Sequence, residues 1–233
     1  RRSERASSPY SQPSGPISIP GIKKEFKNYK DFPIYSLLPT VLNTLSSNLP
    51  IIMITSFFSD KIAGQFGLSR MVLAIPLALI SVSLSQVLLQ KVAEKRQKEE
   101  SIKTLIKSIF LVLLSMSALG SLIIYFFNEP IFNIAFGKDW LIAAQISKIL
   151  IFYFCLDFIT TPLSVVFIAL EHIKVNSTWQ ILHFFLICSL YFCKDFALFD
   201  FITIFMVINI ISYLTYGVLI YFSIKKYEKS LLL

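Results

Sequence analysis

Charged residues are scarce in this 233-residue chain, because Asp, Glu, Lys and Arg make up only 15% of it. A soluble globular domain carries about 25% charged residues, so an ordinary soluble globule is excluded. Glycine is also scarce, with 7 residues, which excludes collagen-like and glycine-rich low-complexity sequences. Since 55% of the residues are hydrophobic and the mean hydropathy is +0.68, a lipid bilayer is the expected surrounding of the chain.

Cysteine and histidine are too few and too scattered to indicate a metal site or a disulfide framework. Cys155, Cys188 and Cys193 lie in or beside apolar runs without zinc-ligand spacing, and neither His172 nor His183 has a ligand-type residue suitably spaced. No nucleotide-binding, metalloprotease or serine-hydrolase motif occurs. The sequence therefore predicts no metal, no cofactor and no enzymatic activity, and we expect His183 to pack among aromatic side chains.

Long apolar runs make up most of the remaining sequence. A transmembrane helix needs roughly 20 mostly apolar residues, and six windows meet this requirement. We predict spans at residues 34–58, 65–90, 108–127, 145–169, 178–192 and 199–224. The predicted fold class is an all-α integral membrane protein, a bundle of six transmembrane helices.

The spans divide the chain into four parts. Residues 1–22 are Ser/Pro-rich and basic, without an apolar core, and are expected to be a disordered or foreign leader. Residues 23–33 form a basic cytoplasmic or interfacial segment, residues 34–224 the six-helix lobe, and residues 225–233 a cytoplasmic tail. Because the sequence begins with Arg1 and not Met, we expect it either to start inside a longer precursor or to carry a foreign leader.

The net charge of +8 is arranged in short blocks between the apolar runs. Nucleic-acid binding would need one continuous basic surface, so it is not expected. Lysine and arginine are concentrated before the first span, after the second and after the sixth, whereas the alternate connections hold few. The positive-inside rule therefore predicts a multi-pass protein of the cytoplasmic membrane with both termini in the cytoplasm.

Two connections have a recognisable composition. Residues 128–144 combine Pro130, Gly137 and Trp140, which predicts a short helix lying in the outer membrane interface. Residues 91–107 mix glutamate and lysine at helical spacing, which predicts a solvated extension of the neighbouring helices.

The first span carries a polar stripe. Its members recur at spacings of four, three, four and three residues, which places them on one helix face: Ser36, Thr40, Asn43, Ser47 and Pro50. Thr44 and Asn48 broaden the stripe. Polar groups at membrane depth face either neighbouring helices or a water-filled cavity, and the sequence leaves both readings open.

The second span has a similar stripe, which includes Gln86 and Gln90, and carries Arg70 about five residues from its outer end. Two interpretations of Arg70 remain open. Its guanidinium could extend to the outer interface, or it could point inward and pair with phosphate, for which its planar set of donors is suited.

Asp157 lies about midway along the fourth span, with Thr161 and Ser164 on its own helix face. A carboxylate at this depth is a candidate for ion coupling, and a protonated or helix-paired structural aspartate is the alternative. Pro50, Pro76 and Pro162 lie inside three spans, where each can bend its helix.

Several segments resemble Wzx-type polysaccharide flippases. Residues 29–33 (YKDFP) and 43–50 (NTLSSNLP) resemble the start of the second half of these proteins. Residues 63–70 (AGQFGLSR), Pro76 and residues 85–87 (SQV), followed by a basic loop, resemble the next helix of the family. Residues 136–140 (FGKDW) resemble its outer loop, and after residue 140 the similarity is one of helix number and spacing.

This resemblance implies membership in the multidrug/oligosaccharidyl-lipid/polysaccharide exporter superfamily, with two six-helix lobes around a central cavity. The implied cargo is an isoprenoid-pyrophosphate-linked oligosaccharide for O-antigen of lipopolysaccharide, capsule or exopolysaccharide. Arg70 would attract the diphosphate, and Asp157 could couple to an ion gradient. The amides and hydroxyl that would line the cavity are Asn43, Ser47, Asn48, Gln86 and Gln90. The first six helices of the family are missing, so the expected partners are an N-terminal six-helix lobe, the substrate and the bilayer.

Two other functions stay open. A MATE-like drug or cation antiporter half would share the architecture but would favour acids over Arg70 in the cavity. An integral membrane polysaccharide polymerase or ligase would place charged catalytic groups in a large outer loop, whereas the predicted outer loops are short.

Overall fold

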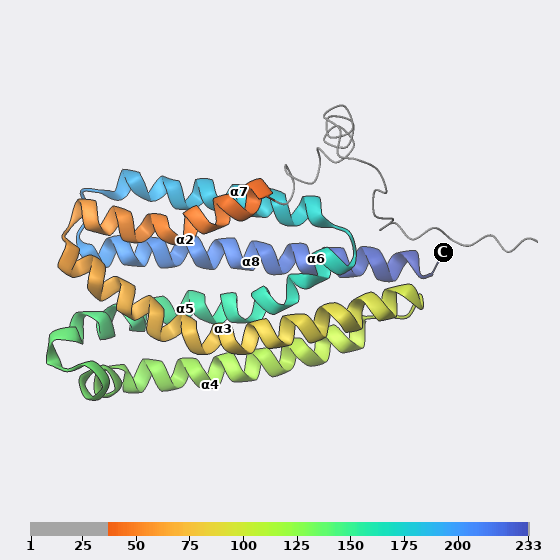
Figure 1. Cartoon of the computed structure of the whole chain (residues 1–233), viewed down its shortest axis with the longest axis horizontal. Helices are drawn as coiled ribbons and strands as arrows, with labels where there is room; N and C mark the ends of the chain where they lie inside the picture. The colour runs from red at the N-terminus through yellow and green to blue at the C-terminus, as the bar shows by residue number, and fades with distance from the viewer. Residues whose placement is uncertain (1–36, 233) are drawn as a thin grey trace, which may run out of the picture.

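The computed structural model describes residues 37–232, and this part of the chain is helical, without a strand (Figure 1). Its elements in order are α2 (Leu38–Phe57), α3 (Asp60–Gln97), α4 (Lys103–Phe136), η2 (Lys138–Trp140), α5 (Leu141–Leu163), α6 (Val165–Ala169), α7 (Ile173–Cys188), η3 (Ser189–Cys193) and α8 (Leu198–Ser230). The predicted segments 1–22 and 23–33, together with Ser36, lie outside the described residues.

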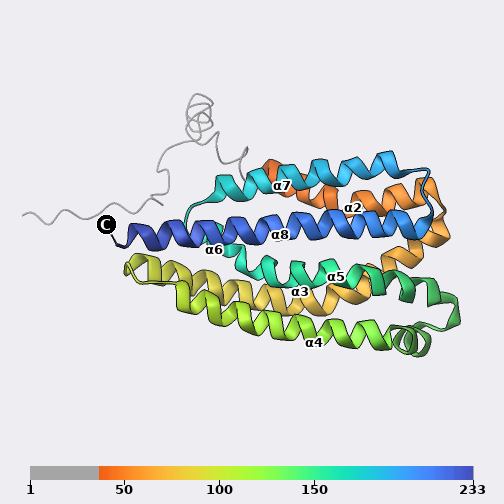
Figure 2. The ribbon, with the colours of Figure 1, turned by 180° about the vertical axis from the view of Figure 1, so that it is seen from behind.

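The long helices run side by side along the longest dimension of the molecule (Figures 1 and 2). The central helix α5 packs against α3, α4 and α8, while α2 packs against α7 and α3. Two large apolar clusters fill most of the bundle, one around Phe66 and Phe201 and the other around Phe167 and Leu88, and a third, smaller one lies around Phe132. Leu77 packs against both large clusters, so the two meet near the middle of α3.

Four helical segments are long and apolar enough to cross a membrane: Asp60–Gln97, Lys103–Phe136, Lys138–Ala169 and Leu198–Ser230. They correspond to the predicted second, third, fourth and sixth spans. Large apolar side chains point outward from them, such as Leu79 and Phe126, at 70% and 67% exposure. The all-helical class is confirmed, and so much exposed apolar surface is unfavourable in water and indicates a membrane protein.

Helices α2 and α7 occupy the predicted first and fifth spans. The first has 20 residues, and the second has 16 and continues as η3. The structure therefore contains a helical segment at each of the six predicted positions. A count of six membrane crossings remains a prediction, because α2 and α7 are not among the four candidate spans of the described residues.

Three predicted boundaries differ from the structure. Helix α4 continues through Pro130 to Phe136, so residues 128–136 form a turned continuation of α4 and not a separate interfacial helix (Figure 1). Proline removes one backbone hydrogen bond, which bends a helix without necessarily ending it. The fourth predicted span breaks after Leu163, next to Pro162, and the predicted tail 225–233 begins as the last turns of α8.

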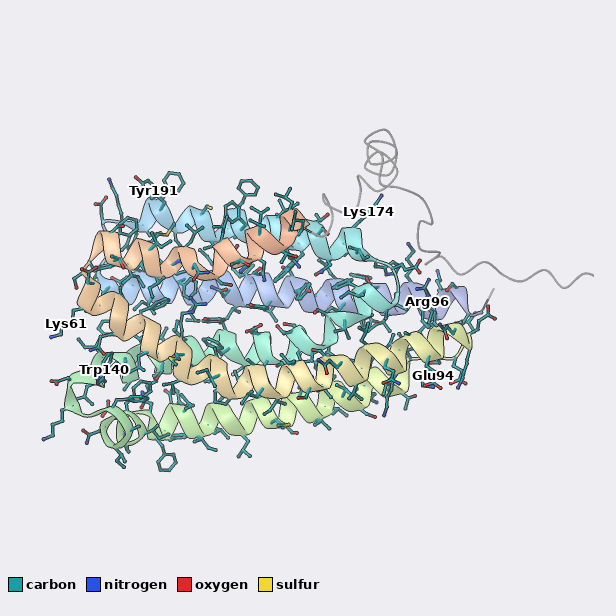
Figure 3. All side chains as sticks on the ribbon, viewed as in Figure 1. Lys61, Glu94, Arg96, Trp140, Lys174 and Tyr191 are labelled. Atoms are coloured by element: carbon teal, nitrogen blue, oxygen red, sulfur yellow. The ribbon has the colours of Figure 1, made fainter. Side chains whose placement is uncertain are left out.

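The two ends of the bundle differ in composition. Figure 3 shows Lys61 and Trp140 at one end and Glu94, Arg96 and Lys174 at the other. A helix of 38 residues is about 57 Å long, well beyond a hydrocarbon thickness of roughly 30 Å, so α3 extends past the apolar region. We call the end with Arg96 the basic end.

At the basic end, α3 and α4 themselves make up most of residues 91–107, and only a short turn joins them. This agrees with the prediction that this segment extends the neighbouring helices. Two ion pairs stabilise the end of α3, Glu94–Lys98 at 2.6 Å and Lys95–Glu100 at 2.8 Å. Glu228 of α8 accepts hydrogen bonds from the backbone amides of Ile102 and Lys103, at 2.8 and 3.0 Å. A carboxylate at a helix N-terminus is stabilising, so this contact joins α8 to the start of α4.

Glu99 follows α3 with a positive φ of 54°, a conformation that costs a non-glycine residue about 1 kcal/mol. The amide of Glu100 donates to the carbonyl of Lys95 at 2.8 Å, which closes the helix end around it. We expect Glu99→Gly to raise the free energy of unfolding by about 1 kcal/mol, measured by thermal unfolding in detergent. Glu100→Gly is the matched control and should destabilise the protein, because it removes the ion pair with Lys95. A loss of stability in Glu99→Gly would contradict this interpretation.

Candidate functional site

A partly open polar cavity of about 370 Å³ lies between the helices, where the two large apolar clusters meet, and Asn43, Ser47 and Thr161 of its wall are exposed. Helices α2, α3, α5, α7 and α8 contribute to its wall. The polar side chains that line it include Asn43, Ser47, Asp157, Thr161, Asn176 and Gln180. Buried polar groups cost free energy unless they are hydrogen-bonded, so a polar space inside an apolar bundle is a candidate binding site.

Asp157 is the acidic group of the cavity, and its side chain is half-buried. The Thr161 hydroxyl donates a hydrogen bond to Asp157 Oδ1 at 2.5 Å, as their shared helix face predicts. Tyr213 of α8 is a second hydrogen-bonding partner, and Arg70 is near enough to act on the carboxylate electrostatically. Asp157 therefore sits among neutral donors, with the nearest cation on another helix.

Arg70 points into the bundle, toward α2 and α5, and this favours the inward interpretation. Its Nη1 donates a hydrogen bond to the backbone carbonyl of Ser47 at 2.5 Å, and it also hydrogen-bonds to Tyr153. The guanidinium carbon lies 5.7 Å from the ring centre of Phe66. Pro50 has no N–H for the carbonyl of Ser46, four residues before it, so Arg70 contacts the backbone of α2 next to the position where the helical hydrogen bonding is interrupted.

Two buried polar atoms near this site have no hydrogen-bond partner in the described structure: Arg70 Nε and Gln180 Oε1. An unsatisfied buried donor or acceptor costs about 1–3 kcal/mol. A donor and an acceptor are therefore both available to a ligand at this site.

Aromatic rings form the wall of the cavity on α7 and α8. Trp179 stacks on Tyr216 with ring centres 3.8 Å apart, and its indole donates to the carbonyl of Ser212 at 3.0 Å. The Tyr216 hydroxyl donates to Asn176 Oδ1 at 2.6 Å. His183 stacks on Trp179 at 5.2 Å, so its predicted packing among aromatic residues is confirmed. These contacts hold the rings in fixed orientations.

The structure brings together only some of the predicted site residues. Asn43, Ser47 and Asp157 line the cavity, and Arg70 borders it. Asn48 does not line it, and its amide donates to the carbonyl of Thr44 in its own helix at 2.8 Å.

Gln86 and Gln90 also lie outside the cavity, exposed on α3. The reason is helical geometry. Residues 74, 77, 78 and 81 of α3 face the cavity, and Gln86 is five residues beyond Ser81, which turns it to another side of the helix.

The sequence reasoning missed the contributions of α7 and α8. Asn176 and Gln180 are one helical turn apart, but the predicted span began at residue 178, whereas α7 begins at Ile173. Tyr213 and Tyr216 were hidden in an apolar run, where an aromatic ring resembles any other core side chain. The spacing of Asn176, Gln180 and His183 is the signal that could have revealed this face.

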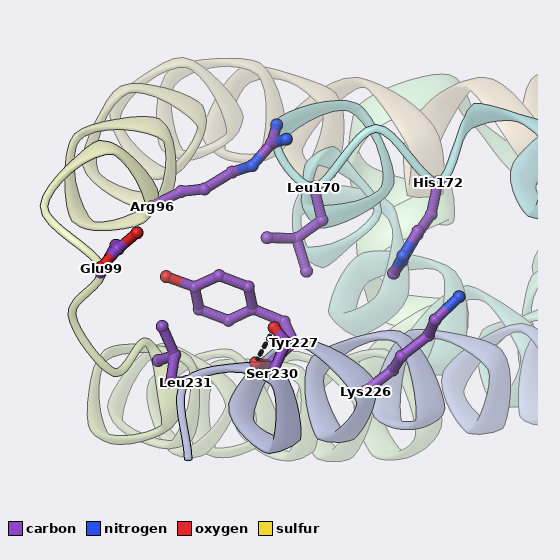
Figure 4. A pocket seen from close by; sticks show the side chains of 8 residues that line it. All are labelled: Arg96, Glu99, Leu170, His172, Lys226, Tyr227, Ser230 and Leu231. Atoms are coloured by element: carbon purple, nitrogen blue, oxygen red, sulfur yellow. Dashed lines mark hydrogen bonds between the residues drawn. The ribbon is translucent and has the colours of Figure 1, made fainter. Parts of the chain in front are cut away.

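A second pocket, of about 590 Å³, lies at the basic end (Figure 4). Arg96 Nη1 donates to the carbonyl of Ala169 at 2.8 Å and pairs with Glu171 at 3.0 Å, and this contact lowers the pKa of the Glu171 carboxyl. Partial burial, with the positive charges of Lys226 and Arg96, lowers the pKa of His172. Arg96 thus connects the end of α3 to the turn between α6 and α7.

Residues 14–145 match the family model described as polysaccharide biosynthesis protein. The match covers more than half of the chain and includes α2, α3 and α4, and with them Asn43, Ser47 and Arg70. Comparisons with curated proteins and with solved structures give no match. The chain, with its membrane-type helices and its polar cavity, belongs to the polysaccharide biosynthesis protein family.

Proposed function

We propose that the chain is a six-helix lobe of a flippase that moves an isoprenoid-pyrophosphate-linked oligosaccharide across the cytoplasmic membrane for O-antigen, capsule or exopolysaccharide synthesis. The observation that carries the proposal is the cavity of amides, hydroxyls and aromatic rings within the apolar bundle of a polysaccharide biosynthesis family member. In this proposal the protein transports and is not an enzyme.

The chemistry of the cargo explains why such a cavity is useful. Sugars and a diphosphate cannot cross hydrocarbon unaided, whereas the isoprenoid tail can stay in the lipid. The amides of Asn43, Asn176 and Gln180 can exchange hydrogen bonds with sugar hydroxyls. The stacked ring of Trp179 offers a flat apolar surface to a sugar face. A volume of about 370 Å³ is within the usual range of ligand pockets, roughly 300–1,000 Å³.

Arg70 is the proposed contact for the diphosphate. One of its donors is used on the Ser47 carbonyl, and its Nε has no partner. A guanidinium has five N–H donors in a planar arrangement that matches phosphate oxygens. Binding of a diphosphate would then draw on donors that the protein itself does not use.

A second six-helix lobe is the proposed partner. Asn48, Gln86 and Gln90 are exposed polar groups on α2 and α3, facing away from the cavity. Polar groups at membrane depth are expected to face protein or water and not lipid tails, so a partner lobe would cover this side. With the basic end in the cytoplasm, both termini of the chain would be cytoplasmic.

The test is translocation of a lipid-linked oligosaccharide in vesicles that contain both lobes, beside vesicles that contain this chain alone. We expect transport with both lobes. The informative variant is Gln180→Leu, which removes a cavity amide whose oxygen has no partner, so stability should not fall. Transport should fall about tenfold, the value of one hydrogen bond to the cargo.

Gln145→Leu is the matched control, since Gln145 is exposed on α5 and lies outside the cavity and outside the side assigned to the partner lobe. It should transport at the unmodified rate. Equal transport by Gln180→Leu and the unmodified protein would remove the cavity from the mechanism. Absence of transport with both lobes present would contradict the proposed function itself.

A MATE-like drug or cation antiporter is the second candidate, and one observation favours it. The carboxylate of Asp157 lies beside the rings of Tyr213 and Tyr216, and such a site can attract an organic cation. Vesicles of the same preparation, with a proton gradient and a fluorescent organic cation, distinguish the two. Uptake of the cation without oligosaccharide transport would favour the antiporter.

A further inference from the structure

Helices α4, α5 and α8 enclose a groove of about 500 Å³ that is separate from the cavity (Figure 2 shows α4 and α8 from behind). Its walls are apolar and include Ile106, Phe110, Leu163 and Ile220. Helix α5 contributes to both spaces from different faces, with Asp157 toward the cavity and Leu163 toward the groove.

Gly217 deepens the groove at the contact between α8 and α5. A Cβ atom placed there would lie 3.7 Å from Thr160 Cγ2, an ordinary contact, so the backbone does not require glycine at this position. The missing side chain instead leaves room between the two helices. The groove therefore has the shape and polarity to hold a hydrocarbon chain.

Three lysines, Lys103, Lys107 and Lys225, line the groove at the basic end, and all three are exposed. In the described part of the chain, none of them forms an ion pair with an acidic side chain. The acid beside them, Glu228, accepts hydrogen bonds from Ser101 and from the first backbone amides of α4. Three cations thus stand beside one carboxylate that already has partners.

We propose that this groove binds an anionic glycerophospholipid. One acyl chain lies along the apolar walls, and the headgroup phosphate contacts Lys103, Lys107 and Lys225. Basic pockets between membrane helices on the side that carries the positive charge recognise anionic headgroups, and the lysine stems lie along the apolar surface. The groove and the cavity are lined from different faces of α5 and α8, so this inference does not depend on the proposed function.

The headgroup contact is tested by native mass spectrometry of the full chain in detergent. The protein is titrated with phosphatidylglycerol or with phosphatidylcholine of identical acyl chains. Phosphatidylglycerol should bind roughly tenfold more tightly. Replacing Lys103, Lys107 and Lys225 by Gln should abolish this preference. The matched control replaces Lys91, Lys98 and Lys229 by Gln, which removes the same charge from the same end outside the groove, and it should keep the preference within about twofold.

Gly217→Leu tests the acyl-chain contact, because the new side chain fills the groove. It should weaken the binding of both lipids, whereas Gly64→Leu, with no atom within 4 Å of its added Cβ, should not. Circular dichroism and thermal unfolding show whether each variant is folded. The proposal would be overturned if both triple Lys→Gln variants lost the preference for phosphatidylglycerol equally, or if Gly217→Leu bound both lipids as the unmodified protein does. It would also be overturned if an isoprenoid phosphate bound more tightly than phosphatidylglycerol.

Discussion

An Arg70→Ala protein is expected to lose both stability and transport. The substitution removes the donor to the Ser47 carbonyl and the cation nearest to Asp157, which should lower the free energy of unfolding by about 2–3 kcal/mol. Loss of the diphosphate contact should lower the translocation rate roughly 100-fold, since charge-assisted hydrogen bonds are the strong ones. Thermal unfolding and vesicle transport measure the two effects.

Arg70→Lys separates the two roles of this side chain. A lysine can donate to the Ser47 carbonyl and keep the positive charge, so most of the stability should return. It cannot offer a planar pair of donors to phosphate, so transport should remain at least about tenfold below the unmodified rate. Full transport by Arg70→Lys would show that Arg70 only stabilises the contact between α2 and α3.

Arg96→Ala is the matched control for the loss of an arginine that binds a backbone carbonyl. Arg96 donates to Ala169 and pairs with Glu171 at the basic end, away from the cavity. Its removal should lower the free energy of unfolding by about 1–2 kcal/mol. The transport rate for each amount of folded protein should equal that of the unmodified protein. A loss of transport as large as that of Arg70→Ala would mean that transport follows stability alone.

Replacing Asp157 by Asn should lower gradient-driven translocation at least about tenfold while the protein stays folded. Asparagine has the same shape and keeps the oxygen that accepts from Thr161, but it cannot take up a proton or balance a cation. The measurement is transport with and without an imposed ion gradient. The gradient should accelerate the unmodified protein and not the variant. Asp195→Asn, at an exposed position, is the control.

The stability of the double variant gives a further test of the same residue. If Arg70 compensates the charge of Asp157, Arg70→Ala with Asp157→Asn should be more stable than Arg70→Ala alone. Additive effects of the two substitutions would contradict an interaction between them.

The sequence predicted the helices well because the signal for a membrane helix is local. A run of about 20 apolar residues is sufficient, and α3, α4 and α8 each contain one. The pairing of Asp157 with Thr161 was also local, since it follows from one helical turn. The ends of the helices were harder to predict, because a proline such as Pro130 can bend a helix without ending it, as it does in α4.

Contacts between helices could not be predicted in the same way. Periodicity placed Asn43 and Ser47 on one face of the first span and Gln86 on a face of the second, but it could not say which faces meet. The structure shows that Asn43 and Ser47 line the same cavity as Asn176 and Gln180 of α7, which were not predicted. Arg70 stayed ambiguous for the same reason, because its partner Ser47 is 23 residues away on another helix.

Photo-crosslinking most directly tests whether the cavity holds the cargo. A photoreactive amino acid would replace Gln180 in the cavity or, as a control, Gln86 on the exposed side of α3, with both lobes in membranes that contain the lipid-linked oligosaccharide. We predict that the oligosaccharide becomes attached at position 180 in preference to position 86, and that excess unlabelled substrate prevents it. Attachment at position 86 and not at position 180, in a protein that transports, would contradict the cavity as the substrate site.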